Sequence, residues 1–475
     1  MFTLRILYGK MIVMKFGGTS VGSAKNIRAV ADIIEKKDGR KIVVVSAMSG
    51  VTDSLSKIAH RIIDLPNSVI KKEANQFIKE ITDKHTSTAK ELIHDERILK
   101  RSLSKIDELS EKLETVLLGV GFLEDLSPKS MDYILSFGER LSITITSSVL
   151  ESKKIKAKAL TGYEAGIVTD SNFGRAHPIH NILAKSIKEN INSLTEEGII
   201  PVVAGFIAAN SEGTITTLGR GGSDYTASLL GRYLKASEVQ IWTDVDGILT
   251  ADPKIVPEAR LIPTLSYIEA VDLAYFGAKV IHSKMIEPAM DVNIPVRIKN
   301  TFNPQGEGTL IVSKQEKIDH VIKAVTAQQD VGIVNLKGVG MIETPNISGK
   351  LFSLLGGKNI NILMISGSSE SNLSFVIKKS LVDDAVETIS AGFGDNSIRS
   401  LEVVEDVCII TVVGVGMQGA KGLAARVFQA VADVDVNIIM IAQGSSEVNI
   451  SFIVDEVDRE KVVKTLHKMF IEDVG

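Results

Sequence analysis

Residues 14–30 read MKFGGTSVGSAKNIRAV, and this stretch decides the fold of the first part of the chain. An apolar run over 11–16 predicts a strand that ends in the pair Gly17-Gly18. A glycine-rich turn after a strand can hold a phosphate, because backbone N–H groups without side chains close around the anion. Lys15 precedes the glycines, whereas the P-loop pattern places its lysine after them. Taken alone, the turn is equally compatible with a phosphate site and with a plain structural turn.

The pattern that follows this turn repeats along the chain. Short apolar runs alternate with helical periodicity from residue 11 to about residue 300, which predicts βαβ units in an open, largely parallel α/β sheet with helices on both faces. A charged, Leu/Ile-periodic stretch over 67–150 predicts helices inserted between strands as one wall of a substrate cleft. The expected strands cover 11–16, 41–47, 198–208, 239–245 and 294–300, and the first helix covers 24–36 with Ser23 as its N-cap.

The last third of the chain contains an internal repeat. Residues 332–377 are similar in sequence to residues 408–454. The GVG triplets of the two copies are offset by 76 positions, and one inserted residue then aligns Asn372 with Asn449. Each copy predicts a ferredoxin-like βαββαβ unit. The resulting domain boundaries are an N-terminal extension over 1–10, a catalytic domain over 11–305, and repeat domains over 320–400 and 401–475, the last with a strand borrowed from 311–325.

Composition excludes several classes of protein. The formal net charge of −4 without a basic block argues against nucleic acid as a partner, and no apolar run approaches the roughly 20 residues of a membrane span. Cys408 is the single cysteine, so an intrachain disulfide framework and a CxxC metal site are excluded, and a reducing cytoplasm is expected. The dinucleotide-like string GVGMQG over 414–419 reads GVGMIE in the first copy, so its third glycine is not part of the shared design.

A second glycine-rich stretch, GRGGSD over 219–224, favours an anion site. An arginine flanked by glycines suits a carboxylate or a phosphate, because its guanidinium binds planar anions through two hydrogen bonds. Asp224 is either a helix cap or part of a site. Glu139 and Arg140 come where an apolar helix is expected to begin, so they form either a solvated first turn or an acceptor for a substrate ammonium group.

Two further segments complete a candidate site. In 242–253, WTDVDGILTADP, Thr243 and Asp244 follow an apolar strand, and carboxylates at strand C-termini are where ligands of open α/β sheets bind. The segment lacks the EF-hand spacing. Lys279 and Lys284 come near the expected end of the sheet, where one of them could simply extend over the surface. With no hydrolase or zinc motif present, phosphoryl transfer without a P-loop remains.

The motifs KFGGTSV, SAMSGVTD, FGERLS, GRGGSD, WTDVDG, ADP and GAKVIH occur in the order seen in aspartate kinases, a branch of the amino acid kinase family, and the chain resembles that family from residue 11 onward. The paired repeat resembles two ACT domains. The resemblance implies a monofunctional enzyme that transfers the γ-phosphoryl group of MgATP to L-aspartate. The products are ADP and 4-phospho-L-aspartate, and the reaction is the first step toward lysine, threonine and methionine.

The resemblance also implies roles for single residues. Lys15 would contact the transferred phosphoryl group above Gly17 and Gly18, and Asp224 would orient Lys15. The residues implied for aspartate are Thr52, Glu139, Arg220 and Ser223, and those for the nucleotide are Gly17, Gly18, Thr243, Asp244 and Lys279. Mg²⁺ would be held mainly by ATP phosphates and water, without a metal site made by the protein.

The ACT pair implies regulation by an amino acid and a homodimer, or a tetramer of two dimers, formed through these domains. The residues implied for the effector are Met341, Ser348, Asn361, Asn437 and Ile438. Threonine is favoured and lysine is the alternative, because Glu343 is the one carboxylate of the loop that could meet a lysine ammonium group. A kinase for glutamate or carbamate and a catalytically silent amino-acid sensor remain as rival functions.

Overall fold

The computed structural model describes residues 10–277, 280–313, 321–337, 347–369, 372–393, 400–444 and 446–473. The chain divides into two compact units, which are described separately below. Unit 1 comprises Met1–Ile248, Pro263–Tyr267 and Val280–Lys314, and unit 2 comprises Leu249–Ile262, Ile268–Lys279 and Gln315–Gly475. Most of the predicted N-terminal extension lies outside the described residues.

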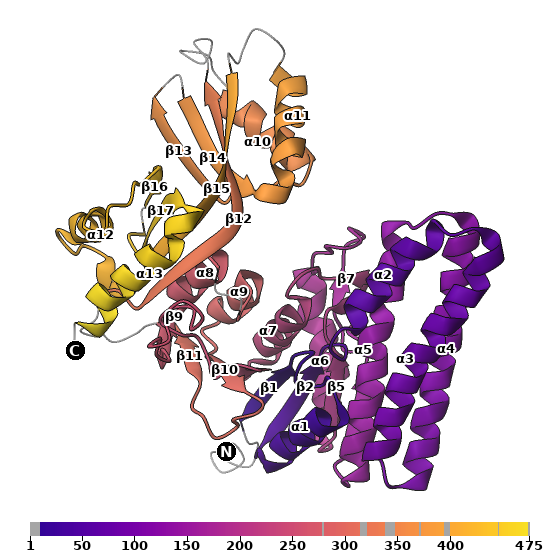
Figure 1. Cartoon of the computed structure of the whole chain (residues 1–475). Coiled ribbons are helices and arrows are strands. Elements are labelled where there is room, and N and C mark those ends of the chain that lie inside the picture. The colour runs from indigo at the N-terminus through magenta and orange to yellow at the C-terminus, as the bar shows by residue number, and fades with distance from the viewer. Residues whose placement is uncertain are drawn as a thin grey trace. The chain divides into compact units, whose positions relative to one another are not determined.

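Unit 1 is built on a sheet of eight strands (Figure 1). They are β1 (Met11–Phe16), β2 (Arg40–Val45), β3 (Ala157–Leu160), β5 (Ile200–Ala204), β8 (Glu238–Thr243), β9 (Thr264–Ser266), β10 (Val296–Asn300) and β11 (Thr309–Val312). Their order is β3-β5-β2-β1-β8-β10-β11-β9, and only the β10–β11 pair is antiparallel among these described strands. The predicted α/β class with a largely parallel sheet is confirmed.

The apolar run over 198–208 is a correction to the predicted strands, because it forms two strands instead of one. The chain leaves β5 at Gly205, where an added Cβ would lie only 2.6 Å from the Ser223 Cβ, and Phe206 turns it with a φ of 65°. This close approach to a helix that follows later in the sequence breaks the run. The second strand, β6 (Ile207–Asn210), joins β4 (Val168–Thr169) and β7 (Ile215–Thr217) in a separate sheet of order β4-β6-β7.

Helices connect these strands and form the predicted helical insertion. The first helix begins after Ser23, whose hydroxyl accepts the Asn26 N–H, which confirms the predicted cap. Long helices fill the 67–150 region as predicted, and Figure 1 shows them running alongside one another. The helices of unit 1 are α1 (Ala24–Lys36), α2 (Val51–Ile63), α3 (Asn67–Leu92), α4 (Glu96–Leu123), α5 (Pro128–Ser152), α6 (His180–Glu196), α7 (Gly222–Leu234) and α9 (Ile286–Met290), with a 3₁₀ turn η1 (Ser283–Met285).

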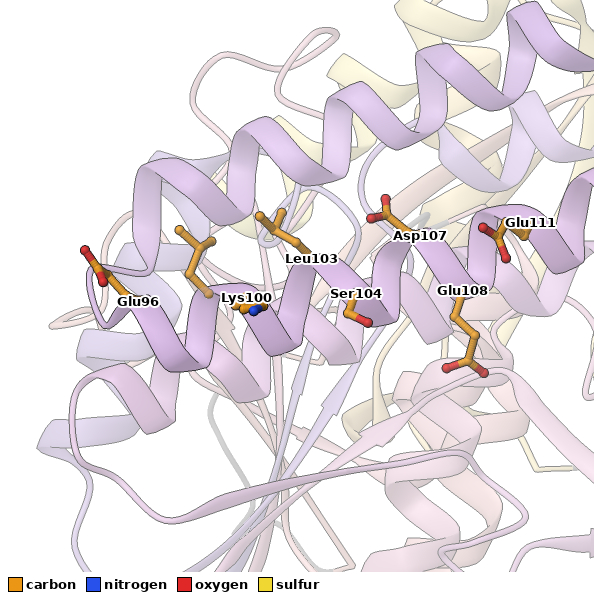
Figure 2. Close-up of a pocket in the computed structure, with 8 residues that line it drawn as sticks. Glu96, Lys100, Leu103, Ser104, Asp107, Glu108 and Glu111 are labelled. Atoms are coloured by element: carbon orange, nitrogen blue, oxygen red, sulfur yellow. The ribbon is translucent and has the colours of Figure 1, made fainter.

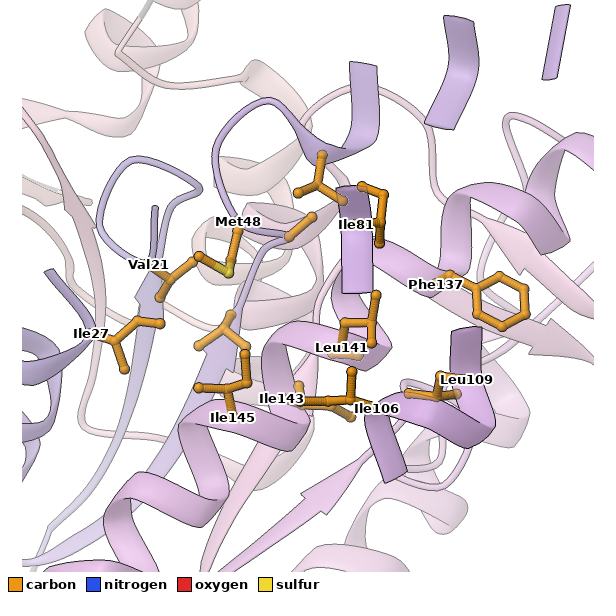
Figure 3. Packing of buried hydrophobic residues seen from close by; sticks show 14 of the residues in the cluster. Val21, Ile27, Met48, Ile81, Ile106, Leu109, Phe137, Leu141, Ile143 and Ile145 are labelled. Atoms are coloured by element: carbon orange, nitrogen blue, oxygen red, sulfur yellow. The ribbon is translucent and has the colours of Figure 1, made fainter. Parts of the chain in front are cut away.

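One hydrophobic core joins the helical insertion to the sheet. Figure 3 shows Leu141 and Ile143 of α5 beside Ile106 and Leu109 of α4, and all four side chains are buried. Burying each such side chain contributes about 1.5–3 kcal/mol relative to leaving it in water. Residues of α5 and of β5 belong to the same core, so this helix is fixed against the sheet. The polar residues along α5 are therefore held in fixed positions.

Unit 2 is built on an antiparallel sheet of six strands. They are β12 (Ala324–Lys337), β13 (Met364–Ser369), β14 (Asn372–Lys378), β15 (Ser400–Val413), β16 (Met440–Ala442) and β17 (Asn449–Asp455), in the order β13-β14-β12-β15-β17-β16. Its helices are α8 (Tyr267–Tyr275), which belongs to this unit from Ile268 onward, α10 (Ile347–Gly357), α11 (Val382–Phe393), α12 (Leu423–Ala432) and α13 (Arg459–His467). The Asn372–Asn449 alignment predicted from the repeat places each residue first in its strand.

The two copies of the repeat share their longest strands. In the first copy, β12 pairs through Val331–Lys337 with β14 and with the first half of β15. In the second copy, the other half of β15 pairs with β17 on one side and with Ala324–Gln328 of β12 on the other. The strand that completes the second copy therefore precedes the first copy in the sequence. None of the helices in the described ranges combines the length and the hydropathy that a bilayer span requires.

Candidate active site

The glycine-rich turn after β1 is fixed against the neighbouring strands. The Gly17 N–H donates to the Trp242 carbonyl at 3.1 Å, and the Ser20 hydroxyl lies 2.7 Å from the Thr301 hydroxyl. A Cβ added at Gly17 would lie 3.6 Å from Lys15 Nζ. The missing side chain therefore leaves space open beside the Lys15 amino group.

Lys15 and Asp224 form an ion pair in which Nζ lies 2.6 Å from Oδ1. Lys15 is only 8% exposed at the end of β1, and Asp224 lies in the first turn of α7. The first N–H groups of a helix have no partners within it and carry partial positive charge. The pair thus joins the β1 turn to a helix N-terminus, and this combination of donors suits an anion.

The GRGG stretch leads into α7 through a tightly packed turn. Gly221 is the N-cap with a φ of 75°, and a Cβ there would lie 2.7 Å from the His282 side chain. Ser223 is buried against Gly205, whereas the Arg220 side chain is exposed. The turn therefore fixes the backbone of the helix start while it leaves the guanidinium group accessible to a ligand.

Glu139 is buried in the middle of α5 and not at the start of a helix, which corrects the predicted position. The helix begins at Pro128, with Ser127 as its N-cap, so Glu139 lies several turns inside it. The Glu139 side chain is only 3% exposed. Burial raises the pKa of its carboxyl to about 8, against the opposing effects of the Ala47 N–H, which donates to Oε1 at 3.1 Å, and of Lys15. Among the described residues, Oε2 has no hydrogen-bond partner. A buried carboxylate oxygen without a hydrogen-bond donor destabilises the folded protein. A cationic ligand with N–H donors would supply the missing partner, so this atom suits such a ligand.

Two of the other predicted contacts, Thr52 and Thr243, lie in unit 1. Thr52 is the second residue of α2, whose N-cap is Gly50 with a φ of 78°. Thr243 ends β8, and its hydroxyl donates to Asp244 Oδ1 at 3.1 Å. Lys279 lies outside the described residues.

The predicted effector residues fall at equivalent places of the two repeat copies in unit 2. Asn361 lies between α10 and β13, and Asn437 and Ile438 lie between α12 and β16. Ser348 is exposed in the first turn of α10. Met341 lies outside the described residues.

Sequence reasoning missed two residues near the site. His282 caps η1 and contacts the position of Gly221, and its pKa is lowered by burial first and then by the neighbouring cations Lys284 and Arg220. His282 belongs to the GAKVIH motif, so the motif pointed to this segment, but the sequence analysis considered only the lysines in and beside it. Asp132, fully buried on α5, accepts hydrogen bonds from the Thr217 N–H and hydroxyl, and nothing local in the sequence indicates that partner.

Two hollows on the surface of unit 1 lie away from these residues. Figure 2 shows the first along the exposed face of α4, where Glu96, Lys100, Asp107 and Glu108 line it together with other residues of that same helix. Side chains from a single helix do not converge on a ligand, so this hollow is not a candidate site. The second is lined by charged and polar residues of β8, β10 and their neighbours: Lys37, Glu238, Gln240, Arg297, Lys299, Gln305, Gly306 and Glu307.

Comparison with known proteins agrees with the predicted resemblance. The amino acid kinase family matches residues 10–300, and the ACT domain family matches 334–393 and 410–470. The chloroplastic aspartokinase 1 of Arabidopsis thaliana is 32% identical over 477 residues, which cover 98% of this chain and 81% of that protein. The chloroplastic aspartokinase 2 of the same plant is 33% identical over 97% of this chain and 84% of its own length.

Solved structures extend this similarity to the whole fold. E. coli aspartokinase III in complex with aspartate and ADP, in the R-state, matches with a TM-score of 0.82 and 30% identity over 97% of this chain and 99% of that one. The same enzyme with lysine and aspartate, in the T-state, matches with a TM-score of 0.79 and 30% identity over the same shares. The predicted family, its kinase class and its ACT domains are confirmed, and the chain belongs to the aspartate kinase branch of the amino acid kinase family.

Proposed function

We propose that this chain transfers the γ-phosphoryl group of MgATP to the side-chain carboxylate of L-aspartate, as the first step toward lysine, threonine and methionine. A bond forms between a carboxylate oxygen and the γ-phosphorus while the bond to the β-phosphate oxygen breaks, which gives 4-phospho-L-aspartate and ADP. The observation that carries this proposal is the Lys15–Asp224 pair at 2.6 Å, where the β1 turn meets the N-terminus of α7.

Lys15, Gly17 and Gly18 form the part of the site proposed for the transferred group. The Lys15 ammonium group neutralises charge on the phosphoryl oxygens, and the glycine turn leaves room for the group to approach. Asp224 orients Lys15 and does not act as a base, because a carboxylate nucleophile is already deprotonated at neutral pH. Catalysis then rests on positioning and on charge neutralisation.

The aspartate is proposed to lie between α5 and the GRGG turn. Its ammonium group would meet Glu139 Oε2, the buried oxygen that lacks a partner among the described residues. Its α-carboxylate would pair with the exposed Arg220, while Thr52 and Ser223 complete the contacts. The ammonium group brings a positive charge to a buried carboxylate, so substrate binding and ionisation of Glu139 favour each other.

The nucleotide is proposed to contact Thr243, Asp244 and Lys279. No group of three His, Cys, Asp or Glu side chains in the described ranges is arranged to hold a metal. Mg²⁺ is proposed to enter as part of MgATP, with phosphates and water as most of its ligands. When bound, Mg²⁺ neutralises phosphate charge and orients the transferred group.

Regulation and assembly are proposed from the ACT pair. An end-product amino acid inhibits the enzyme at the residues around Met341, Ser348, Asn361, Asn437 and Ile438. Threonine is favoured by the loop sequence, and lysine is the alternative, since E. coli aspartokinase III has been solved with lysine. A homodimer through these domains, or a tetramer of two dimers, and a cytoplasmic location complete the proposal.

One coupled assay of ADP release tests this function. Turnover with aspartate but not with glutamate or carbamate is the expected result. Equal turnover with glutamate would identify a related kinase, and ATP-independent binding of amino acids without ADP release would identify a sensor. Repeating the aspartate assay with added threonine or lysine tests the regulation, and indifference to both would refute it.

A further inference from the structure

A buried carboxylate of α8 lies against the loop that opens the second repeat copy. Glu269 Oε1 accepts the Val415 N–H at 2.7 Å, and Oε2 lies 2.8 Å from Lys323 Nζ. Glu269 is fully buried and the Lys323 side chain is 9% exposed. A backbone donor and an ammonium group together compensate the buried carboxylate, so this position of unit 2 is built for a carboxylate.

The internal repeat shows what this position corresponds to. Val415 belongs to the GVG triplet over 414–416, at the end of β15 and before α12. The equivalent triplet of the first copy, 338–340, precedes the proposed effector residue Met341 and lies outside the described residues. We take the strand-to-helix loop of an ACT copy, which in the first copy leads to the proposed effector residues Met341 and Ser348, as the place where the carboxylate of a free amino acid binds, because backbone N–H groups there can donate to an oxyanion.

We propose that Glu269 is an internal ligand of the second ACT copy: its carboxylate occupies the loop donor that would otherwise receive the carboxylate of a free amino acid. The loop of the second copy therefore holds a helix of its own chain, and the carboxylate of the effector is left to the loop of the first copy. This inference rests on the proposed regulation, since it assigns the two copies different partners.

Further contacts with the second copy come from α8 and from the two residues that follow it. Asp272 Oδ2 accepts the Asn449 side-chain N–H at 2.8 Å, at the start of β17. The Thr326 hydroxyl, on the part of β12 that completes the second copy, donates to the Phe276 carbonyl at 3.1 Å. A Cβ at Gly277, whose φ is 118°, would lie 3.0 Å from the Ala327 carbonyl. These contacts fix α8 and the residues up to Gly277 on the second copy.

Calorimetry with threonine and with lysine on the full chain tests this assignment. The wild type is expected to bind a single effector per chain, and Glu269→Ala, which frees the Val415 N–H, is expected to bind a second. Glu269→Gln keeps an oxygen at the loop and is expected to remain at a single effector. Glu460→Ala, at an exposed position of α13, is the surface control. Two effectors per wild-type chain, or no second effector in Glu269→Ala, would overturn the proposal.

A second measurement keeps the test independent of the proposed regulation. Hydrogen exchange of the peptide containing Val415 is expected to accelerate in Glu269→Ala and to slow again with acetate, which can replace the lost carboxylate, but not with chloride at equal ionic strength. If the wild type binds neither amino acid, the proposed regulation fails. Slower hydrogen exchange of the Val415 peptide of Glu269→Ala in acetate then decides by itself whether the loop is a carboxylate site. Absence of acetate protection would overturn it. Should Glu269→Ala not fold, Glu269→Ala/Lys323→Met also removes the buried ammonium group, and the second effector is measured there.

Discussion

Replacing Glu139 by glutamine makes the energetic cost of the proposed substrate site measurable. Burial raises the pKa of Glu139 from 4.5 to about 8. The folded protein therefore holds this proton more tightly than the unfolded chain does, and stability is lost as pH rises from about 4.5 to about 8. Each pKa unit corresponds to about 1.4 kcal/mol, so the ionised carboxylate destabilises the ligand-free protein by at most about 5 kcal/mol.

Glu139→Gln removes this titration, because the amide can still accept the Ala47 N–H but carries no charge. The free energy of unfolding of the variant is expected to exceed that of the wild type by an amount that grows by about 3 kcal/mol between pH values of roughly 5.5 and 8. Urea unfolding followed by the fluorescence of Trp242 measures it. This is the single tryptophan of the chain, and it is 4% exposed against Phe16 of the same unit.

The same substitution is expected to act in the opposite direction on the substrate. The Michaelis constant for aspartate in the wild type falls as pH rises toward about 8, because an ionised Glu139 receives the ammonium group. In Glu139→Gln this pH dependence disappears and the constant rises roughly 10- to 100-fold, the loss of a hydrogen bond to a charged group. Glu151→Gln, at the partly exposed C-terminal end of the same helix in a pair with Arg101, is the control and leaves both profiles unchanged. A stability difference that is the same at all pH values would refute the argument.

Three further substitutions test the remaining parts of the site. Lys15→Ala is expected to lower turnover at least about 100-fold while ATP affinity, measured by calorimetry, changes only a few-fold, and near-normal turnover would contradict the phosphoryl contact. Arg220→Ala is expected to raise the Michaelis constant for aspartate roughly 10- to 100-fold with a smaller effect on turnover, and an unchanged constant would remove the carboxylate assignment. Gly221→Ala is expected to destabilise by about 2–4 kcal/mol in urea unfolding, because φ is 75° and the new Cβ meets His282, whereas Gly213→Ala, with a φ of 78° in open space, costs only about 1 kcal/mol.

The parts of the fold that the sequence predicted are those decided by nearby residues. The strand over 11–16 and the helix capped by Ser23 depend on an apolar run and on a hydroxyl three residues from its N–H partner. The run over 198–208 was misjudged because its break at Gly205 comes from contact with Ser223, a partner that the local pattern does not show. Tertiary contacts of this kind override a periodic pattern, and they are invisible in a single sequence.

The candidate site shows the same contrast between features that nearby residues decide and features that distant contacts decide. Lys15 and Asp224, which are 209 positions apart in the printed sequence, were joined only through the family resemblance, and the structure brings their charged atoms to 2.6 Å. Asp132 has its partner Thr217 85 positions away and belongs to no recognised motif, so nothing pointed to it. Charge and motif order indicated the candidate site, whereas the contacts that hold its backbone in place are visible only in the structure.

The interleaved strands of unit 2 connect the two copies of the repeat. Each copy contributes half of β12 and half of β15, so neither has a complete sheet without the other. An amino acid that binds the first copy therefore acts on strands that also belong to the second. If Glu269 keeps the second copy on α8, a change in the first copy reaches α8 through Ala324–Gln328 and Thr326 without a second ligand. Tyr275, whose hydroxyl donates to the Ile362 carbonyl next to the proposed effector residue Asn361, gives the first copy a direct contact to the same helix.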